Sequence, residues 1–318
     1  MEEKSYTTEE VAQILKVSKL TIYDLVKKGL LPTYRVGRQM RIAPSDLEEY
    51  INRSKNGRQP SSSSEIKVSK NINKDQRSSE MKGIRQIVIT GQDLSLDILA
   101  NYIENTMIDI RPLRSYAGSL ESLISMYQGY SDIVSTHLLD GQSGEYNLPY
   151  INKILVNFEY VVINLLSRNV GFYVQKGNPK QIKNWLDLKT KNVEILNREK
   201  GSGTRVLIDE SLKIHRIHSH EVLGYEREET THLSVASAVA NGIVDVAVGI
   251  EKTANLVQGV DFIPLGKERY DLVLLKNAEN EELIIKIQEI LKSPNFKNDL
   301  LALGGYDLSK TGQIIFET

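Results

Sequence analysis

The first fifty residues alternate between short amphipathic segments and turns. Thr7 and Glu10 have the spacing of a capping box, and apolar residues at helical spacing follow them. A second helix is predicted from Lys19 to Lys28, with a polar and basic outer face. The pattern then changes to the two-residue alternation of a hairpin around Gly37-Arg38, followed by a third helix over 44–51. Two helices joined by a tight turn and followed by a hairpin are typical of a helix-turn-helix unit.

From residue 84 onward, apolar runs of strand length alternate with segments of helical periodicity. Such alternation is typical of an α/β domain with a parallel sheet. The strands are expected at 84–90, 107–113, 132–134, 193–196 and 245–248, and the helices at 94–103, 120–127, 206–212 and 234–240.

Between these regions, residues 53–82 lose the apolar periodicity. This stretch contains Pro60 followed by four serines, and it has eight basic residues against three acidic ones. That composition is typical of a flexible, positively charged tether. The sequence therefore predicts a helix-turn-helix domain at 1–53, a linker at 54–83 and a large α/β domain at 84–318.

The overall composition indicates a water-soluble globular protein, but it does not identify the molecules to which the protein binds. Of 318 residues, 40% are hydrophobic and 25% charged, as expected of a water-soluble globular protein. The chain contains no cysteine, so disulfide and thiol chemistry are excluded, and no apolar run is long enough for a membrane span. The acidic start of the chain lacks the features of a secretory signal. We therefore expect a cytoplasmic protein with no membrane partner.

The N-terminal region resembles the excisionase-type winged helix-turn-helix, a relative of the mercury-resistance-regulator fold. The motifs are Thr8-Glu9-Glu10-Val11-Ala12, Thr21-Ile22-Tyr23, Gly29-Leu30-Leu31-Pro32, Val36-Gly37-Arg38 and Arg41-Ile42. The resemblance implies a second helix in the major groove of duplex DNA and a hairpin wing along the phosphates or the minor groove. The candidate DNA-binding residues are Ser18, Lys19, Thr21, Tyr23, Lys27, Arg35, Arg38 and Arg41. The alternative is a small protein-interaction module with a solvated basic face.

The turn Gly201-Ser202-Gly203-Thr204-Arg205 is the strongest candidate binding element. It lies between a predicted strand and a predicted helix, so the free N–H groups and positive dipole end of that helix would face an anion. The hydroxyls would add hydrogen bonds, and Arg205 would add a cation. In the alternative interpretation, this is a capped helix start, and Arg205 faces solvent or pairs with Asp209 or Glu210.

Other polar residues follow the predicted strands, where ligands bind in open α/β sheets. Together with the turn they give the candidate ligand-binding residues Asp93, Ser119, His137, Ser202, Gly203, Thr204, Arg205, Thr231 and His232. For Asp93, capping of the following helix is the alternative, because its carboxylate would repel a doubly charged anion. For His137 and His232 the alternative is a structural role. No spacing of cysteine, histidine or carboxylates supports a metal site, and none suggests catalytic residues.

Residues 84–310 resemble the periplasmic-binding-protein-like domain related to molybdate-binding proteins and found attached to molybdopterin-biosynthesis proteins and helix-turn-helix regulators. The motifs are 137–140, 144–147, 201–205, 231–236, 242–250 and 268–273. The resemblance implies a two-lobed α/β domain of the type II periplasmic-binding-protein (Venus-flytrap) class, with strands crossing near 160–166 and 270–275. Lobe one would comprise about 84–165 and 270–318, and lobe two about 166–269. The ligand expected in the cleft is molybdate or tungstate, with a small organic acid as the alternative.

Together these features predict a DNA-binding transcription regulator that responds to a small anion and has no cofactor or catalytic activity. We expect a homodimer, because one winged head buries little DNA surface. The alternatives are a protein of molybdenum-cofactor assembly, a transport binding protein and a recombination directionality factor. The first lacks a catalytic constellation, the second conflicts with the DNA-binding head, and the third leaves the large domain without a role.

Overall fold

The computed structural model describes most of the large domain and separate stretches of the N-terminal region. The described residues are 5–15, 19, 22, 25–26, 31–36, 39–44, 46–47, 50, 83–190 and 192–318, without side chains at 34–36, 39 and 190. The contacts divide the chain into two units, Met1–Lys74 and Asp75–Thr318. No helix among the described residues is both long and apolar enough to cross a bilayer.

The N-terminal unit combines a helix with a small antiparallel sheet. Its elements are β1 (Tyr6–Thr7), α1 (Thr8–Leu15), β2 (Tyr34–Val36) and β3 (Gln39–Ile42), and the strand order is β1-β3-β2. The predicted capping box is present, since the N–H of Glu10 donates to the Thr7 hydroxyl (3.2 Å) and the N–H of Thr7 donates to the Glu10 carboxylate (2.8 Å). Val11 of α1 packs against Ile22, Leu31 and Ile42 in a small core.

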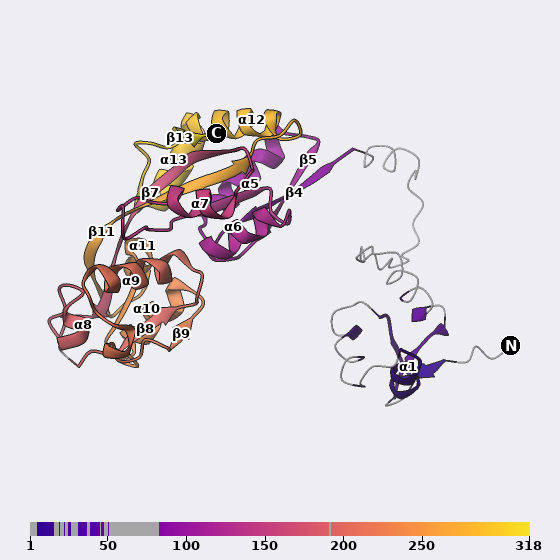
Figure 1. The fold of residues 1–318 in the computed structure, drawn as a ribbon, viewed down its shortest axis with the longest axis horizontal. Coiled ribbons are helices and arrows are strands. Elements are labelled where there is room, and N and C mark those ends of the chain that lie inside the picture. Colours follow the sequence, from indigo (N-terminus) through magenta and orange to yellow (C-terminus); the bar gives the residue numbers. More distant parts are fainter. Residues whose placement is uncertain are drawn as a thin grey trace. The chain divides into compact units, whose positions relative to one another are not determined.

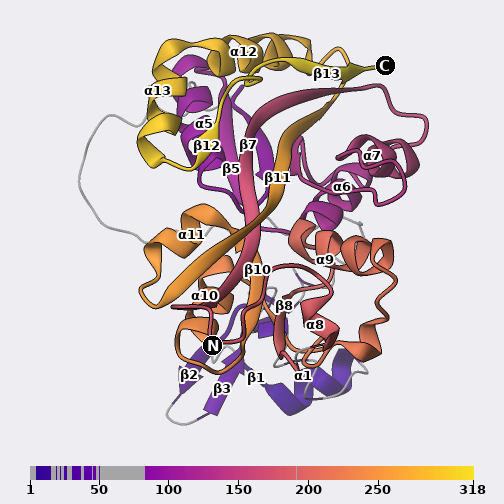
Figure 2. The same ribbon diagram turned by 90° about the vertical axis from the view of Figure 1, so that its left-hand side faces the viewer.

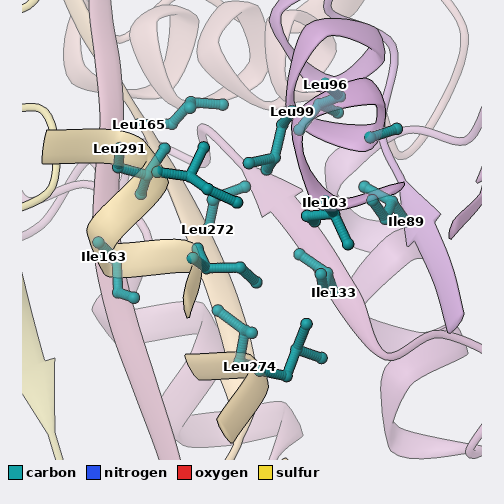
Figure 3. Packing of buried hydrophobic residues seen from close by; sticks show 14 of the residues in the cluster. Ile89, Leu96, Leu99, Ile103, Ile133, Ile163, Leu165, Leu272, Leu274 and Leu291 are labelled. Carbon is teal, nitrogen blue, oxygen red and sulfur yellow. The ribbon is translucent and has the colours of Figure 1, made fainter. Parts of the chain in front are cut away.

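Lobe one of the large unit is a three-layer arrangement around parallel strands (Figure 1). Strand β4 lies between β5 and β6 and is parallel to both. Helices from both ends of the large unit cover this sheet, and their apolar residues form one core with β4, β6 and the long strands, as Figure 3 shows. The elements are β4 (Arg85–Thr90), α5 (Ser95–Thr106), β5 (Ile110–Ser115), α6 (Ser119–Tyr127), β6 (Ile133–Thr136), α7 (Leu148–Ile154), α12 (Glu281–Lys292), α13 (Pro294–Leu303), β12 (Tyr306–Asp307) and β13 (Ile314–Glu317).

Lobe two repeats the same design with the middle of the chain. Strand β8 lies between β10 and β9 and is parallel to both. Separate apolar clusters occupy the two sides of this sheet. The elements are α8 (Asp187–Thr190), β8 (Ile195–Arg198), α9 (Gly203–Ile214), the 3-10 turn η1 (Ser219–Glu221), β9 (Glu228–Glu229), α10 (His232–Ala240), β10 (Val246–Ile250) and α11 (Glu251–Leu256).

Two long antiparallel strands, β7 (Tyr160–Gln175) and β11 (Val260–Leu275), run through both lobes and join them (Figure 2). They make the sheet mixed rather than parallel, in the order β5-β4-β6-β11-β7-β10-β8-β9. Each strand is 16 residues long, more than twice the length of the predicted crossing segments. The polar residues Ser167-Arg168-Asn169 suggest the end of a strand in the sequence, but β7 continues through them because Arg168 is buried between the lobes.

Candidate functional site

A cavity of about 400 Å³ lies between the two lobes. Its lining comes from the segments after β4, β5, β6, β8, β9 and β10, from the crossing strands β7 and β11, and from Tyr306 of β12. Five helices begin at this cavity, namely α5 and α6 of lobe one and α9, α10 and α11 of lobe two. Because each helix start carries free N–H groups and positive dipole potential, the cavity suits an anion.

The structure brings together all the predicted ligand residues except Arg205. The residues that line the cavity are Asp93, Ser119, His137, Ser202, Gly203, Thr204, Thr231 and His232. They come from separate loops of both lobes, as the rule for the carboxyl ends of strands implies.

Arg205 does not line the cavity, which corrects the sequence-based expectation. Its guanidinium donates to Asp209 and to Glu228, each at 3.1 Å, and lies over the ring of Tyr225 at 4.4 Å. Asp209 is one helical turn further along α9, so the helix itself brings the two side chains together. The alternative of a structural arginine paired with Asp209 therefore describes this residue.

The start of α9 offers polar groups that the described part of the protein leaves unpaired. The hydroxyl of Ser202 caps the helix and accepts from the N–H of Arg205 at 3.2 Å, while no hydrogen bond is present from the N–H groups of Gly203 and Thr204 to any described residue. The Thr204 hydroxyl is buried and also lacks a partner among the described residues. Buried polar groups usually have hydrogen-bond partners, so these groups are well placed to bind a ligand.

The start of α10 repeats this arrangement. Thr231 caps the helix by accepting from the N–H of Ser234 at 3.0 Å. The Nδ1 atom of His232 is buried, and no described group bonds to it. Burial, together with Arg198 and Arg168, lowers the pKa of His232 well below its ordinary value, so the ring is neutral near pH 7. We call Gly203, Thr204 and His232 the unpaired edge of the cavity.

The cavity also borders on a cluster of buried charged residues at the paired strands β7 and β11. Unlike the groups of the unpaired edge, these side chains are paired with one another. Arg168 of β7 pairs with Glu268 of β11 (Nε to Oε1, 2.6 Å) and with Asp93 of lobe one. His137 Nδ1 lies 3.1 Å from the other oxygen of Glu268. We call Asp93, His137, Arg168 and Glu268 the ionic cluster.

Each carboxylate oxygen of the ionic cluster has at least one hydrogen-bond or ion-pair partner. Asp93 accepts from the N–H of Ser95 and from the Tyr306 hydroxyl, both at 2.8 Å, in addition to its ion pair with Arg168. Asp93 therefore binds the first N–H group of α5, although the N-cap residue of that helix is Leu94, and its charge is paired with Arg168. Burial raises the pKa of Asp93 and of Glu268, but other effects outweigh burial and hold both pKa values below their ordinary range. At Asp93 these are the charge of Arg168 and the hydrogen bonds from Ser95 and Tyr306, and at Glu268 they are His137 and Arg168.

Three cations and a tyrosine at the cavity were not predicted from the sequence. Arg168 and Arg198 are buried, and Lys252 and Tyr306 face each other across the lobes. Arg198 is held by Glu199, by the side chain of Gln92 and by the carbonyl of Thr230, each at 2.8 to 2.9 Å. For Arg168, the available signal was the polar stretch Ser167-Arg168-Asn169 between two apolar runs.

The lobes touch beside the cavity. The N–H of Leu120 in α6 donates to the Gly201 carbonyl at 3.0 Å, and the Gln92 amide donates to Glu199 at 3.1 Å. Gly203 packs directly against the His137 ring, because a Cβ added there would lie 2.4 Å from a ring carbon. The structure therefore has its lobes in contact around the cavity.

The DNA-binding candidates are described only in part. Lys19 is helical and exposed and pairs with Glu9, Arg35 belongs to β2, and Arg41 lies in β3. The remaining candidates lie outside the described residues, namely Ser18, Thr21, Tyr23, Lys27 and Arg38.

The comparison with protein families decides the family. The family model described as PBP superfamily domain matches residues 100–292, which is more than half of the chain. The chain belongs to the PBP superfamily. A second model, described as a helix-turn-helix domain, matches residues 5–55. The predicted fold class, a winged helix-turn-helix followed by a two-lobed binding-protein-like domain, is confirmed.

Known relatives of this PBP-superfamily chain include proteins without an assigned role. It is 48% identical to the uncharacterized protein YvgK of Bacillus subtilis over 317 residues, which cover all of this chain and 99% of the relative. An uncharacterized protein in the ferredoxin 2Fe-2S gene 5' region of Clostridium pasteurianum is 46% identical over 112 residues, which cover 35% of this chain and 99% of that protein.

Solved structures support the fold of the large unit. A putative phosphate ABC transporter substrate-binding protein with bound phosphate from Clostridium perfringens has a TM-score of 0.52 at 15% identity, covering 70% of this chain and 99% of that one. The tungstate ABC transporter from Geobacter sulfurreducens gives 0.52 at 12% identity, covering 69% and 98%. A mutant of OxyR from Corynebacterium glutamicum, with hydrogen peroxide bound, gives 0.50 at 12% identity, covering 93% and 89%. At these identities the likeness concerns the fold alone.

Proposed function

We propose that this PBP-superfamily protein is a cytoplasmic transcription regulator whose affinity for duplex DNA changes when a small anion binds between its lobes. The observation that carries the proposal is the unpaired edge, which faces a cavity in a chain that also has a helix-turn-helix domain. Helix starts that converge on one cavity are a general arrangement for binding an anion. The proposed activity is binding, with no chemical reaction.

The mechanism rests on linkage between lobe contact and DNA affinity. If hydrogen-bond donors of both lobes bind the same anion, the anion stabilises the state in which the lobes are in contact. In a homodimer, this change would alter the spacing of two DNA-binding heads, and DNA affinity would follow. Molybdate and tungstate, which the sequence resemblance favours, are the first anions to test.

The experiment measures DNA binding by the full-length protein with and without anions. DNA sites are first selected by the protein from a random library, and fluorescence anisotropy then gives affinity with molybdate, tungstate, phosphate or carboxylates present. We expect at least one anion to change affinity by about 5- to 150-fold, the usual range of coupling between two sites. Arg38→Ala should weaken binding to all DNA sequences and reduce its salt dependence. The proposal is contradicted if the protein binds no DNA. It is also contradicted if anions bind to the protein but none of them changes its affinity for DNA.

A further inference from the structure

The cavity is larger than a bare oxyanion requires. Its volume is about 400 Å³. A tetrahedral oxyanion is about the size of two or three water molecules, roughly 60–90 Å³ at ~30 Å³ for each water. Pockets for organic ligands begin at about 300 Å³. The volume therefore fits an organic anion better than molybdate, tungstate or phosphate.

Further closure of the lobes would not remove this excess volume. Two interlobe hydrogen bonds are already present, from Leu120 to Gly201 and from Gln92 to Glu199. A Cβ added to Gly118 would lie 2.8 Å from the Gly201 carbonyl oxygen, so the backbones are near their closest approach here. The cavity therefore has this volume while the two lobes of the protein are already in contact.

Part of the lining is apolar and exposed. Leu94, Tyr116 and Leu256 line the cavity, and each is more than half exposed, at 55%, 65% and 72%. A bare oxyanion makes no use of such surface, whereas the carbon skeleton of an organic acid would cover it and gain from its removal from water.

Lys252 of α11 supplies a further positive group at the same cavity. Its ammonium lies 3.4 Å from the Tyr306 hydroxyl and 4.5 Å from the centre of that ring, and it forms no ion pair with any described residue. Burial lowers the pKa of Lys252 and Arg168 adds to this effect, while Asp93 opposes it. Asp93 is already occupied by Arg168, Ser95 and Tyr306, so an incoming acid would be the better partner for this ammonium.

We propose that the ligand is a small organic acid with two acidic ends. One end binds at the unpaired edge, where the Thr204 hydroxyl lacks a partner among the described residues, and Lys252 binds the other. This inference rests on the proposed function, because it assumes that an anion binds between the lobes. Lys252 then determines specificity, since only a two-ended acid satisfies both groups at once.

The test is isothermal calorimetry on the full-length protein with probes of known length and charge. The two-ended probes are succinate, glutarate and phosphonoacetate, the one-ended probes are acetate and butyrate, and the bare oxyanions are molybdate, tungstate and phosphate. We expect the best two-ended acid to bind at least tenfold more tightly than butyrate or any oxyanion. Lys252→Met should remove most of that advantage and leave butyrate binding unchanged.

Lys183→Met is the matched control, because Lys183 is exposed and does not line the cavity. This variant should bind every probe as the wild type does. If an oxyanion binds most tightly and Lys252→Met does not weaken it, the inference is wrong and the proposed function stands. If a two-ended acid binds equally well to Lys252→Met, the assigned role of Lys252 is wrong. If no probe binds, both the inference and the proposed function are contradicted.

Discussion

The ionic cluster and the unpaired edge face the same cavity but differ in how their polar groups are satisfied. In the cluster, Arg168 has two carboxylate partners, and each of those carboxylates has further donors. At the edge, the Thr204 hydroxyl and His232 Nδ1 are buried, yet no described residue bonds to them. A satisfied buried network stabilises the fold, whereas unpaired buried groups are available to a ligand.

We therefore expect two groups of residues at one cavity to have different roles, one in the stability of the protein and the other in its affinity for ligand. Changes in the ionic cluster should lower stability whether or not ligand is present. Changes at the unpaired edge should lower ligand affinity and leave the ligand-free protein as stable as before. The predictions below test that separation.

The largest effect is expected from Arg168→Met. Removing the guanidinium leaves the carboxylates of Asp93 and Glu268 buried without their main cation, which should lower the free energy of unfolding by about 3–5 kcal/mol. Urea denaturation of the ligand-free protein measures the loss. The matched control is Arg227→Met, which breaks the exposed pair with Glu194 and should cost less than about 1 kcal/mol. Equal losses in the two variants would show that the cluster is not a stabilising network.

The second effect is a loss of stability in acid. Because the pKa values of Asp93 and Glu268 are lower in the folded protein than in the unfolded chain, their stabilisation is complete above the unfolded values of about 3.9 and 4.3. It should decrease as the pH falls below that range. Urea denaturation between pH 3 and pH 7 measures this decrease. In Glu268→Gln the decrease should be shallower, and an unchanged slope would rule out Glu268 as a contributor.

Arg205→Ala should lower the stability of the ligand-free protein by about 1–2 kcal/mol. The guanidinium is buried, but its partners Asp209 and Glu228 are partly exposed, so the loss should be smaller than at Arg168. The rise in melting temperature on addition of ligand should match that of the wild type. A smaller rise in melting temperature than in the wild type would show that Arg205 contributes to ligand binding.

The smallest effect on stability, and a clear one on binding, is expected from Thr204→Val. Ligand affinity should fall by about two- to tenfold, because one neutral hydrogen bond contributes about 0.5–1.5 kcal/mol. The ligand-free protein should be no less stable, since the change removes a hydroxyl that has no partner among the described residues. Thr311→Val is the control, because its buried hydroxyl donates to the Leu165 carbonyl at 2.9 Å outside the cavity. That variant should lose stability and keep its ligand affinity.

The sequence predicted the fold and the loops of the site because both follow from local patterns. Alternation of strands and helices identified the sheets, and the rule for strand ends selected the loops that contain His137, Thr204 and His232. The capped start of α9 at Ser202, one of the two interpretations of that turn, also follows from short-range spacing.

Side-chain direction and long-range pairing could not be predicted in this way. Arg205 was expected to face the ligand, but a partner one turn along α9 and another on β9 hold it elsewhere. Arg168 became a cavity residue only because Glu268, 100 residues further along the chain, lies opposite it in the strand pairing. The Lys252–Tyr306 contact likewise joins elements of different lobes.

The most direct test of the account is a crystal structure of the full-length protein with the anion that binds most tightly in calorimetry. The account predicts an acidic group of that ligand within about 3.2 Å of the Thr204 hydroxyl and the first N–H groups of α9. It also predicts that the pairs of Arg168 with Asp93 and Glu268 remain intact. An acidic group bound instead to Arg168, with either carboxylate displaced, would contradict the division between ionic cluster and unpaired edge.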